Sequence, residues 1–237
     1  MINTYFSPRQ IVDVDRNSEH ILNRYGIAKT SNKSILDNAF SNNFNGLFIV
    51  DVLNCFYEVD NIAHTEFEKY EIPTLVDYLK RSHKYYISKR IPEIEQTIDN
   101  ITSQESNILG SFLKNFFKQY KHDLQRHFDT EEKNIFPFAL KLHNYHYFDD
   151  VSHIKFLKEK HNFVMQFLDN HKKEKSELKK IEQSLIEYKS KNVTTLSYLD
   201  ILLQRLKNFH VDMKIHSEIE DNVLESKIKY ILKNSRL

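Results

Sequence analysis

Apolar residues recur at every third or fourth position along most of the chain after residue 71, and this spacing predicts long amphipathic helices. Four such stripes are found, and each includes a histidine. The first stripe comprises Leu75, Val76, Leu79, His83, Ile87, Ile94 and Ile98, and the second comprises Leu109, Phe112, Phe116, Tyr120, Leu124, His127, Glu131 and Ile135. The third comprises Ile154, Leu157, His161, Val164 or Met165, and Leu168, and the fourth comprises Leu199, Leu202, Leu206, Phe209, Met213, His216, Glu220 and Leu224. This pattern predicts an all-α fold, with an up-down four-helix bundle over residues 71–237.

Two prolines interrupt these stripes. Pro92 lies inside the first stripe, where a missing N–H predicts a kink or a break. Pro137 follows the second stripe and predicts its end, so that a linker covers residues 143–150. The Lys- and Glu-rich stretch 171–192 between the third and fourth stripes predicts an exposed extension.

Residues 1–70 predict a small, mostly helical N-terminal segment that precedes the bundle. Gly26 follows a short helical pattern and predicts its end, and a second short helix is expected at residues 35–40. The apolar run 47–57 fits either a strand or a buried helix, and helix is favoured. Pro73 lies where the first long helix is expected to begin.

Composition narrows the class of protein. Three glycines and four prolines in 237 residues disfavour a turn-rich β protein. The 34 basic and 33 acidic side chains are interspersed, which predicts neither a nucleic-acid nor a membrane partner. A single cysteine, Cys55, excludes a disulfide within the chain and a thiolate-rich metal site. No signal peptide or membrane span is recognised, so a cytoplasmic location is expected.

The twelve histidines are numerous for this length, and two of them begin the same motif. The stretch from His127 to Ile135 and the stretch from His216 to Leu224 both read His-x-x-x-Glu-acid-x-x-aliphatic. Residues four apart lie on one face of an α-helix, so each copy directs an imidazole and a carboxylate the same way. Each copy could therefore bind a metal ion from a single helix.

The four stripes together give six candidate metal ligands: His83, His127, Glu131, His161, His216 and Glu220. Burying carboxylates and imidazoles without partners is costly, and a pair of metal ions removes that cost. The two-fold pattern suits two metals, each taking two histidines, with Glu131 and Glu220 as bridges. Nitrogen and oxygen ligands without thiolate suit iron, manganese or zinc, and the arrangement most resembles a non-haem di-iron site in a helix bundle.

The competing interpretation is that these histidines are hydrogen-bonded core residues of a metal-free bundle. The remaining histidines lack the spacing or the Glu partner and are interpreted as surface groups or as groups behind the ligands: His122, His143, His146, His153 and His210. Glu132 and Asp221, one position after each ligand carboxylate, rotate by about 100° away from the ligand face, which places them behind the ligands or in solvent. Tyr86 and Tyr120 are expected in the core.

With these motifs, residues 72–230 resemble the haemerythrin-like domain of the Repair of Iron Centres family of di-iron proteins. The motif beginning at His127, with Phe136-Pro137 at its end, and the motif beginning at His216 are the most specific matches. His83 with Ile91-Pro92-Glu93, and Lys160-His161, match the family's first and third helices. The resemblance implies that the six candidate residues are the complete ligand set of two oxo- or hydroxo-bridged iron ions.

The resemblance also implies a function in the stress response, namely repair of iron–sulfur clusters damaged by nitric oxide or oxidative stress. Damaged iron–sulfur proteins would be the partners, and nitric oxide or oxygen species the small ligands. The sequence leaves open whether the site donates iron or acts as a nitric oxide reductase, and whether the chain forms a homodimer. The family's N-terminal domain has adjacent cysteines where this chain has Ala28-Lys29-Thr30-Ser31, so thiol chemistry does not carry over. The alternative function is an oxygen-sensing, redox-sensing or iron-storing binding protein.

Overall fold

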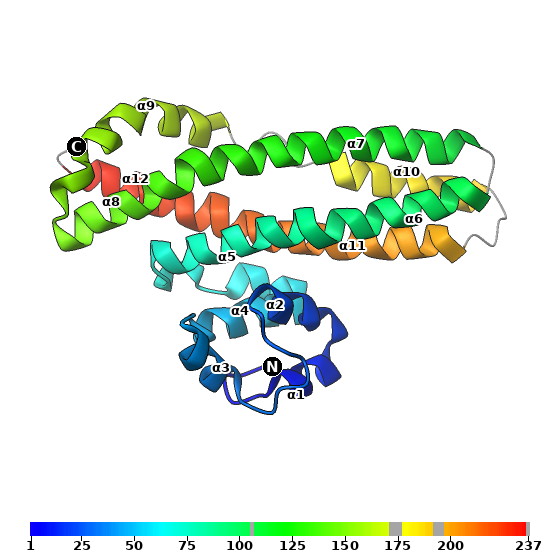
Figure 1. Cartoon of the computed structure of the whole chain (residues 1–237), viewed down its shortest axis with the longest axis horizontal. Coiled ribbons are helices and arrows are strands. Elements are labelled where there is room, and N and C mark those ends of the chain that lie inside the picture. The colour runs from blue at the N-terminus through cyan, green and yellow to red at the C-terminus, as the bar shows by residue number, and fades with distance from the viewer. Residues whose placement is uncertain (105–106, 171–176, 192–196, 236–237) are drawn as a thin grey trace. The chain divides into compact units, whose positions relative to one another are not determined.

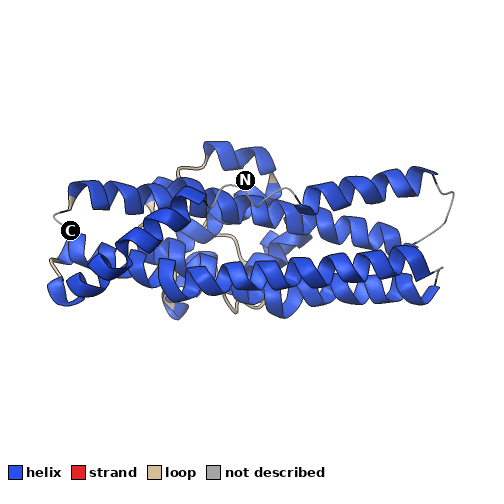
Figure 2. Cartoon of the chain, turned by 90° about the horizontal axis from the view of Figure 1, so that it is seen from above, coloured by secondary structure: helices blue, strands red, loops and turns tan. Residues whose placement is uncertain are grey.

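The computed structural model describes all residues except 105–106, 171–176, 192–196 and 236–237. The described part of the chain consists of helices, turns and connections and contains no strand, which confirms the predicted all-α class (Figure 2). None of its helices is both long and apolar enough to cross a membrane.

The helices are labelled as in Figure 1. The first six are α1 (Pro8–Val14), α2 (Glu19–Arg24), α3 (Ile35–Asn42), α4 (Gly46–Tyr57), α5 (Ile72–Tyr85) and α6 (Ile91–Gln104). They are followed by α7 (Asn107–Thr130), α8 (Phe136–Phe148), α9 (Ile154–Asn170), α10 (Glu177–Lys191), α11 (Ser197–Ser217) and α12 (Glu225–Asn234). Three π-helical turns, η4 (Tyr86–Arg90), η5 (Glu131–Ile135) and η8 (Glu218–Leu224), connect consecutive α-helices.

The chain divides into two compact units. Unit 1 comprises Met1–Ser82, Ala139–Leu157 and Val211–Leu237, and unit 2 comprises His83–Phe138 and Lys158–His210. The division falls within α5, α8, α9 and α11. The expected division at residue 70, between a small N-terminal segment and the bundle, stays a prediction.

In unit 1 the N-terminal helices pack around the apolar run 47–57, which the sequence left open between a strand and a helix. This run forms α4, as favoured, and the Asn45 side chain caps it by accepting a hydrogen bond from the Phe48 N–H at 3.1 Å. The buried Phe48 ring meets Tyr70 and Tyr78 with ring centroids 5.0 and 5.4 Å apart. Gly26 follows α2 with a φ of 65°, the left-handed conformation that ends helices. The N-terminal segment is therefore packed onto the start of α5 within this unit.

In unit 2 the long helices α6 and α7 lie side by side along their length (Figure 1). They are antiparallel, because Lys114 pairs with Asp99 at 2.8 Å while Lys121, further along α7, pairs with Glu95 at 2.9 Å. At their close approach a Cβ on Gly110 would lie 2.5 Å from the Thr102 hydroxyl oxygen, so a larger residue does not fit there. Glycine thus lets the two helices meet directly after their connection.

Pro92 changes the helix in the predicted place. Proline has no N–H, so the carbonyl four residues earlier loses its α-helical partner. The chain responds with the π-helical turn η4, in which the Ile91 N–H donates to the Tyr86 carbonyl five residues back. The predicted kink or break is therefore a π-helical turn between α5 and α6.

The prediction that Pro137 ends the second helix is wrong. The π-helical turn η5 accommodates this proline in the same way, with the Phe136 N–H donating to the Glu131 carbonyl. The helical path then continues as α8 to Phe148, so most of the predicted linker is helical.

Two further predictions need correction. The stretch 171–192 is not simply an exposed extension, because α10 buries an apolar stripe of Leu178, Ile181 and Leu185. Residues 171–176 and Asn192 lie outside the described residues.

The predicted apolar face of α7 also needs correction. Phe112 is exposed, and the buried apolar side chains of α7 are Leu113, Phe117, Leu124 and Phe128. Aromatic residues at neighbouring positions make the exact buried face of this helix ambiguous from sequence.

Candidate metal centre

The first His-x-x-x-Glu motif forms a close pair in unit 2. His127 lies in the last turn of α7 and Glu131 begins η5, and the His127 Nε2 atom lies 2.7 Å from Glu131 Oε1. The Glu131 side chain has no exposed surface. The prediction that the four-residue spacing brings this imidazole and carboxylate to one face is confirmed.

His83, from the end of α5, faces the same carboxylate. Its Nε2 atom lies 3.3 Å from Glu131 Oε2, and its Nδ1 atom lies 3.0 Å from Glu132 Oε1. The imidazole is 2% exposed and stacks on Phe128 with ring centroids 3.8 Å apart. Glu131 therefore presents one oxygen to each of two imidazoles.

Glu132 sets the orientation of the His83 ring. A proton on Nδ1 that is donated to the Glu132 carboxylate leaves the Nε2 lone pair directed toward Glu131. A lone pair and a carboxylate oxygen repel each other, so a proton or a metal cation between them is required. Glu132 itself is 44% exposed. Glu132 was predicted to lie either behind the ligands or in solvent. It contacts the candidate ligand His83 and also reaches solvent.

The π-helical turn η5 places these carboxylates. A π-helical turn holds more residues than an α-turn, so neighbouring side chains are separated by a smaller angle, and such turns occur often at functional sites. Glu131 and Glu132 are its first two residues, and both reach His83 from adjacent positions. The Pro137 ring beyond the turn favours this geometry, since proline cannot supply the α-helical hydrogen bond.

The second motif forms its own pair in unit 1. His216 lies near the end of α11 and Glu220 lies in η8, and His216 Nε2 is 3.4 Å from Glu220 Oε2. Both side chains are buried. The two copies of the motif thus share their spacing, a buried carboxylate and a π-helical turn that contains this carboxylate.

His161 is half-buried on α9. None of the hydrogen bonds or ion pairs found among the described residues involves it. Its helix does pack beside the first pair, because Lys160 donates to the Asn134 side-chain oxygen at 3.0 Å and the Phe167 ring stacks on His127 at 5.9 Å. The role of His161 as a ligand stays a prediction.

Of the two places predicted for His143, at the surface or behind the ligands, the structure excludes the surface. It is 3% exposed on α8, and its Nε2 atom lies 3.7 Å from Glu71 Oε2 within unit 1. Burial lowers the pKa of His143, and the Glu71 carboxylate partly offsets that change. His122 is exposed, whereas His146, His153 and His210 are half-buried. Tyr86 is a core residue as expected, and Tyr120 is half-buried with its ring near Phe209.

The residues fit a metal ion of the predicted kind. Buried Glu131 offers an oxygen within 4.8 Å of a ligand nitrogen of His83, and likewise of His127. Carboxylate and imidazole without thiolate suit iron, manganese or zinc. Cys55 does not join this chemistry, because its buried sulfur lies 3.3 Å from the Thr65 hydroxyl and burial raises the thiol pKa to about 11.

No protein-family model, no curated protein and no solved structure matches this chain. The resemblance to the Repair of Iron Centres family consequently rests on the motif residues alone.

Proposed function

We propose that the chain is a non-haem di-iron protein whose helices form a haemerythrin-like four-helix bundle. One observation carries the proposal: the Glu131 carboxylate is fully buried and presents its two oxygens to two imidazole nitrogens, at 2.7 and 3.3 Å. A buried carboxylate in such surroundings is stabilised by a cation, because desolvation of an isolated charge costs several kcal/mol.

The proposed ligands are the six residues predicted from the sequence: His83, His127, Glu131, His161, His216 and Glu220. Glu131 and Glu220 would bridge two iron ions and the histidines would be terminal ligands. Bound iron would supply the redox and ligand-exchange chemistry that side chains lack. The protein contributes burial, which excludes water, and the Glu132 contact, which fixes which His83 nitrogen is available.

We propose that the particular function of this di-iron protein is the repair of iron–sulfur clusters. The chain would help to restore iron–sulfur clusters damaged by nitric oxide or oxidative stress in the cytoplasm, by donating iron, by reacting with nitric oxide, or by both. This proposal rests on the resemblance of the two His-x-x-x-Glu motifs, and of Ile91-Pro92-Glu93 and Phe136-Pro137, to the Repair of Iron Centres family. The thiol chemistry of the family's N-terminal domain is not included, since Cys55 is buried and protonated.

The first experiment is elemental analysis with an optical spectrum, on protein purified from iron-supplemented cells. The expected result is about two iron ions per chain, as the six-ligand set implies, with near-ultraviolet absorption from an oxo bridge. Glu131→Leu should lower the iron content while the helical circular dichroism is retained. Asp129→Leu is the matched control, because Asp129 is an exposed acid at the end of α7, two residues before Glu131, and it pairs with Lys133. Iron-free wild-type protein, or full iron retention by Glu131→Leu, would refute the site.

The repair function has a separate test. Iron-loaded protein is added, together with sulfide and a reductant, to an iron–sulfur enzyme whose cluster has been destroyed by nitric oxide, and recovery of the cluster is followed by its visible absorption. Recovery should require the wild-type site and fail with Glu131→Leu. Reversible formation of an oxygenated complex without any cluster recovery would favour the sensing or storage function instead.

A further inference from the structure

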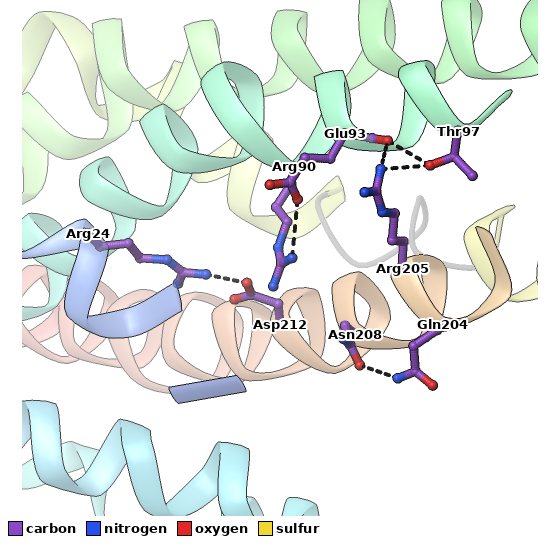
Figure 3. A network of polar contacts seen from close by, with 8 residues as sticks. All are labelled: Arg24, Arg90, Glu93, Thr97, Gln204, Arg205, Asn208 and Asp212. Atoms are coloured by element: carbon purple, nitrogen blue, oxygen red, sulfur yellow. Dashed lines mark hydrogen bonds and ion pairs between the residues drawn. The ribbon is translucent and has the colours of Figure 1, made fainter. Parts of the chain in front are cut away.

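A buried ion pair in unit 1 joins the N-terminal segment to the helix that carries His216. Arg24, on α2, donates from Nη2 to Asp212 Oδ2 on α11, and both side chains have no exposed surface (Figure 3). Removing two charges from water is costly, and well-packed apolar residues often give equal or greater stability. A fully buried pair of this kind therefore calls for a role other than stability.

Two of the partners of Arg24, Asp212 and Ser82, lie within four residues of candidate ligands in the chain. Asp212 precedes His216 by four residues on α11, which places the two on the same helix face. The other guanidinium nitrogen, Nη1, donates to the Ser82 hydroxyl at 3.0 Å, and Ser82 directly precedes His83. One guanidinium from the N-terminal segment thus contacts α5 and α11 at positions adjacent to ligands.

Arg24 is itself held in place. Arg81 donates to the Arg24 carbonyl at 3.2 Å, and so satisfies one of the carbonyl groups at the end of α2. The Arg81 guanidinium lies 4.8 Å from the centre of the Tyr25 ring, and its Nε atom is 2.8 Å from Asp77 Oδ2. These contacts hold the end of α2 against α5, and they restrict the backbone from which the Arg24 side chain extends.

We propose that Arg24 is a positioning residue, through which the docked N-terminal segment holds the turn of α11 that bears His216 and so slows release of the metal. This inference rests on the proposed di-iron site. A planar guanidinium suits the task, because it can bind a carboxylate and a hydroxyl in fixed directions at once. Loosening the segment would free α11 at Asp212, and metal exchange would then become faster.

The test compares the wild-type chain with a double variant, Arg24→Met with Asp212→Leu. The double change removes both charges of the pair together and replaces the ion pair by an apolar contact. The control is Arg205→Met, because Arg205 lies on the same helix and binds the Thr97 hydroxyl at 2.7 Å, as well as the Glu93 carbonyl, without contacting Asp212 (Figure 3). Arg24→Lys keeps the charge and serves as the conservative variant.

Two readouts are measured on the chain of 237 residues. Iron release into an excess of a ferrous chelator should be about tenfold faster in the double variant, the size of effect that residues behind metal ligands produce, and unchanged in Arg205→Met. In the metal-free protein, backbone amide hydrogen exchange around residues 212–220 should rise in the double variant and stay unchanged in Arg205→Met. Arg24→Lys should fall between wild type and the double variant, because one ammonium cannot replace both guanidinium contacts.

The outcomes are distinguishable. Equal iron release and equal amide exchange in wild type and the double variant would overturn the positioning role and leave the di-iron site intact. Wild-type protein that binds no iron would overturn both proposals. Should the double variant lose its helical circular dichroism, Arg24→Lys decides the matter: unchanged release in that variant would refute the role of the guanidinium.

Discussion

Replacing Glu132 by glutamine should weaken metal binding without disturbing the fold. The Glu132 carboxylate lies 3.0 Å from His83 Nδ1, and glutamine keeps an acceptor oxygen in nearly the same place while removing the charge. A carboxylate behind a histidine ligand makes the imidazole more basic and fixes its tautomer, and its loss usually costs 10- to 100-fold in metal affinity.

The structure indicates which end of that range applies. Glu132 is 44% exposed, so water screens its charge and can partly take its place. We therefore expect about a tenfold loss of affinity for Glu132→Gln, equivalent to about 1.4 kcal/mol. Glu132→Leu removes the acceptor as well as the charge and should approach the upper end, a loss of about a hundredfold.

The assay is anaerobic competition for ferrous iron between the protein and a chelator of known affinity, with circular dichroism as the test of folding. Asp129→Asn is the matched control, because Asp129 is an exposed acid in the preceding turn whose partner is Lys133. Equal iron affinities for Glu132→Gln and Asp129→Asn would refute the reasoning, since they would show that the His83 contact has no effect on the metal.

Three further predictions follow from particular residues. Burial lowers the pKa of His143, so as the pH falls below about 6.5 the unfolded chain takes up a proton there before the folded chain does, and the folded state loses stability. His143→Phe removes this group, and the free energy of unfolding measured with urea should therefore fall less with decreasing pH than in the wild type. Cys55, with a thiol pKa of about 11, should react slowly with iodoacetamide at pH 8, where about one thiol in a thousand is ionised, and rapidly after unfolding. Pro137→Ala restores a backbone N–H and should raise the free energy of unfolding by about 1 kcal/mol while lowering iron affinity, because η5 can then revert to an α-turn.

Each of these has an outcome that contradicts it. An identical pH dependence of unfolding in His143→Phe and the wild type would show that this imidazole is not responsible. Fast alkylation of native Cys55 would contradict its burial. If Pro137→Ala changes neither the free energy of unfolding nor the iron affinity, the proline does not maintain the π-helical turn.

The parts of the fold that were predictable are those that depend on neighbours in the chain. The helical period placed His127 beside Glu131 and His216 beside Glu220, and the structure confirms both pairs within their own units. Gly26 ended a helix as predicted, because its left-handed conformation is a local property. The predicted four-helix bundle and the complete six-ligand set depend on how distant parts of the chain assemble, and both remain proposals.

Contacts between residues distant in sequence could not be predicted in this way. Arg24 and Asp212 are 188 positions apart, and neither belongs to a local pattern that would indicate a buried ion pair. The burial of one face of α10 was also missed, because its lysines and glutamates dominate the composition while three spaced apolar residues form the contact. Tertiary packing decided these features, and a single sequence shows only the residues available for it.

Pro92 and Pro137 show where the sequence rule for proline in helices fails, and Pro137 also connects the fold to the candidate site. Pro92 and Pro137 were interpreted through the α-helical rule, under which proline ends or bends a helix. In both places the chain instead adopts a π-helical turn, and η5 also carries the two carboxylates that face His83. The residue that disrupts the regular helix is thus the residue that favours the geometry of the candidate ligands. A proline six positions after a carboxylate of a His-x-x-x-Glu motif is therefore consistent with a π-helical turn at the site, a pattern that can be sought in other sequences.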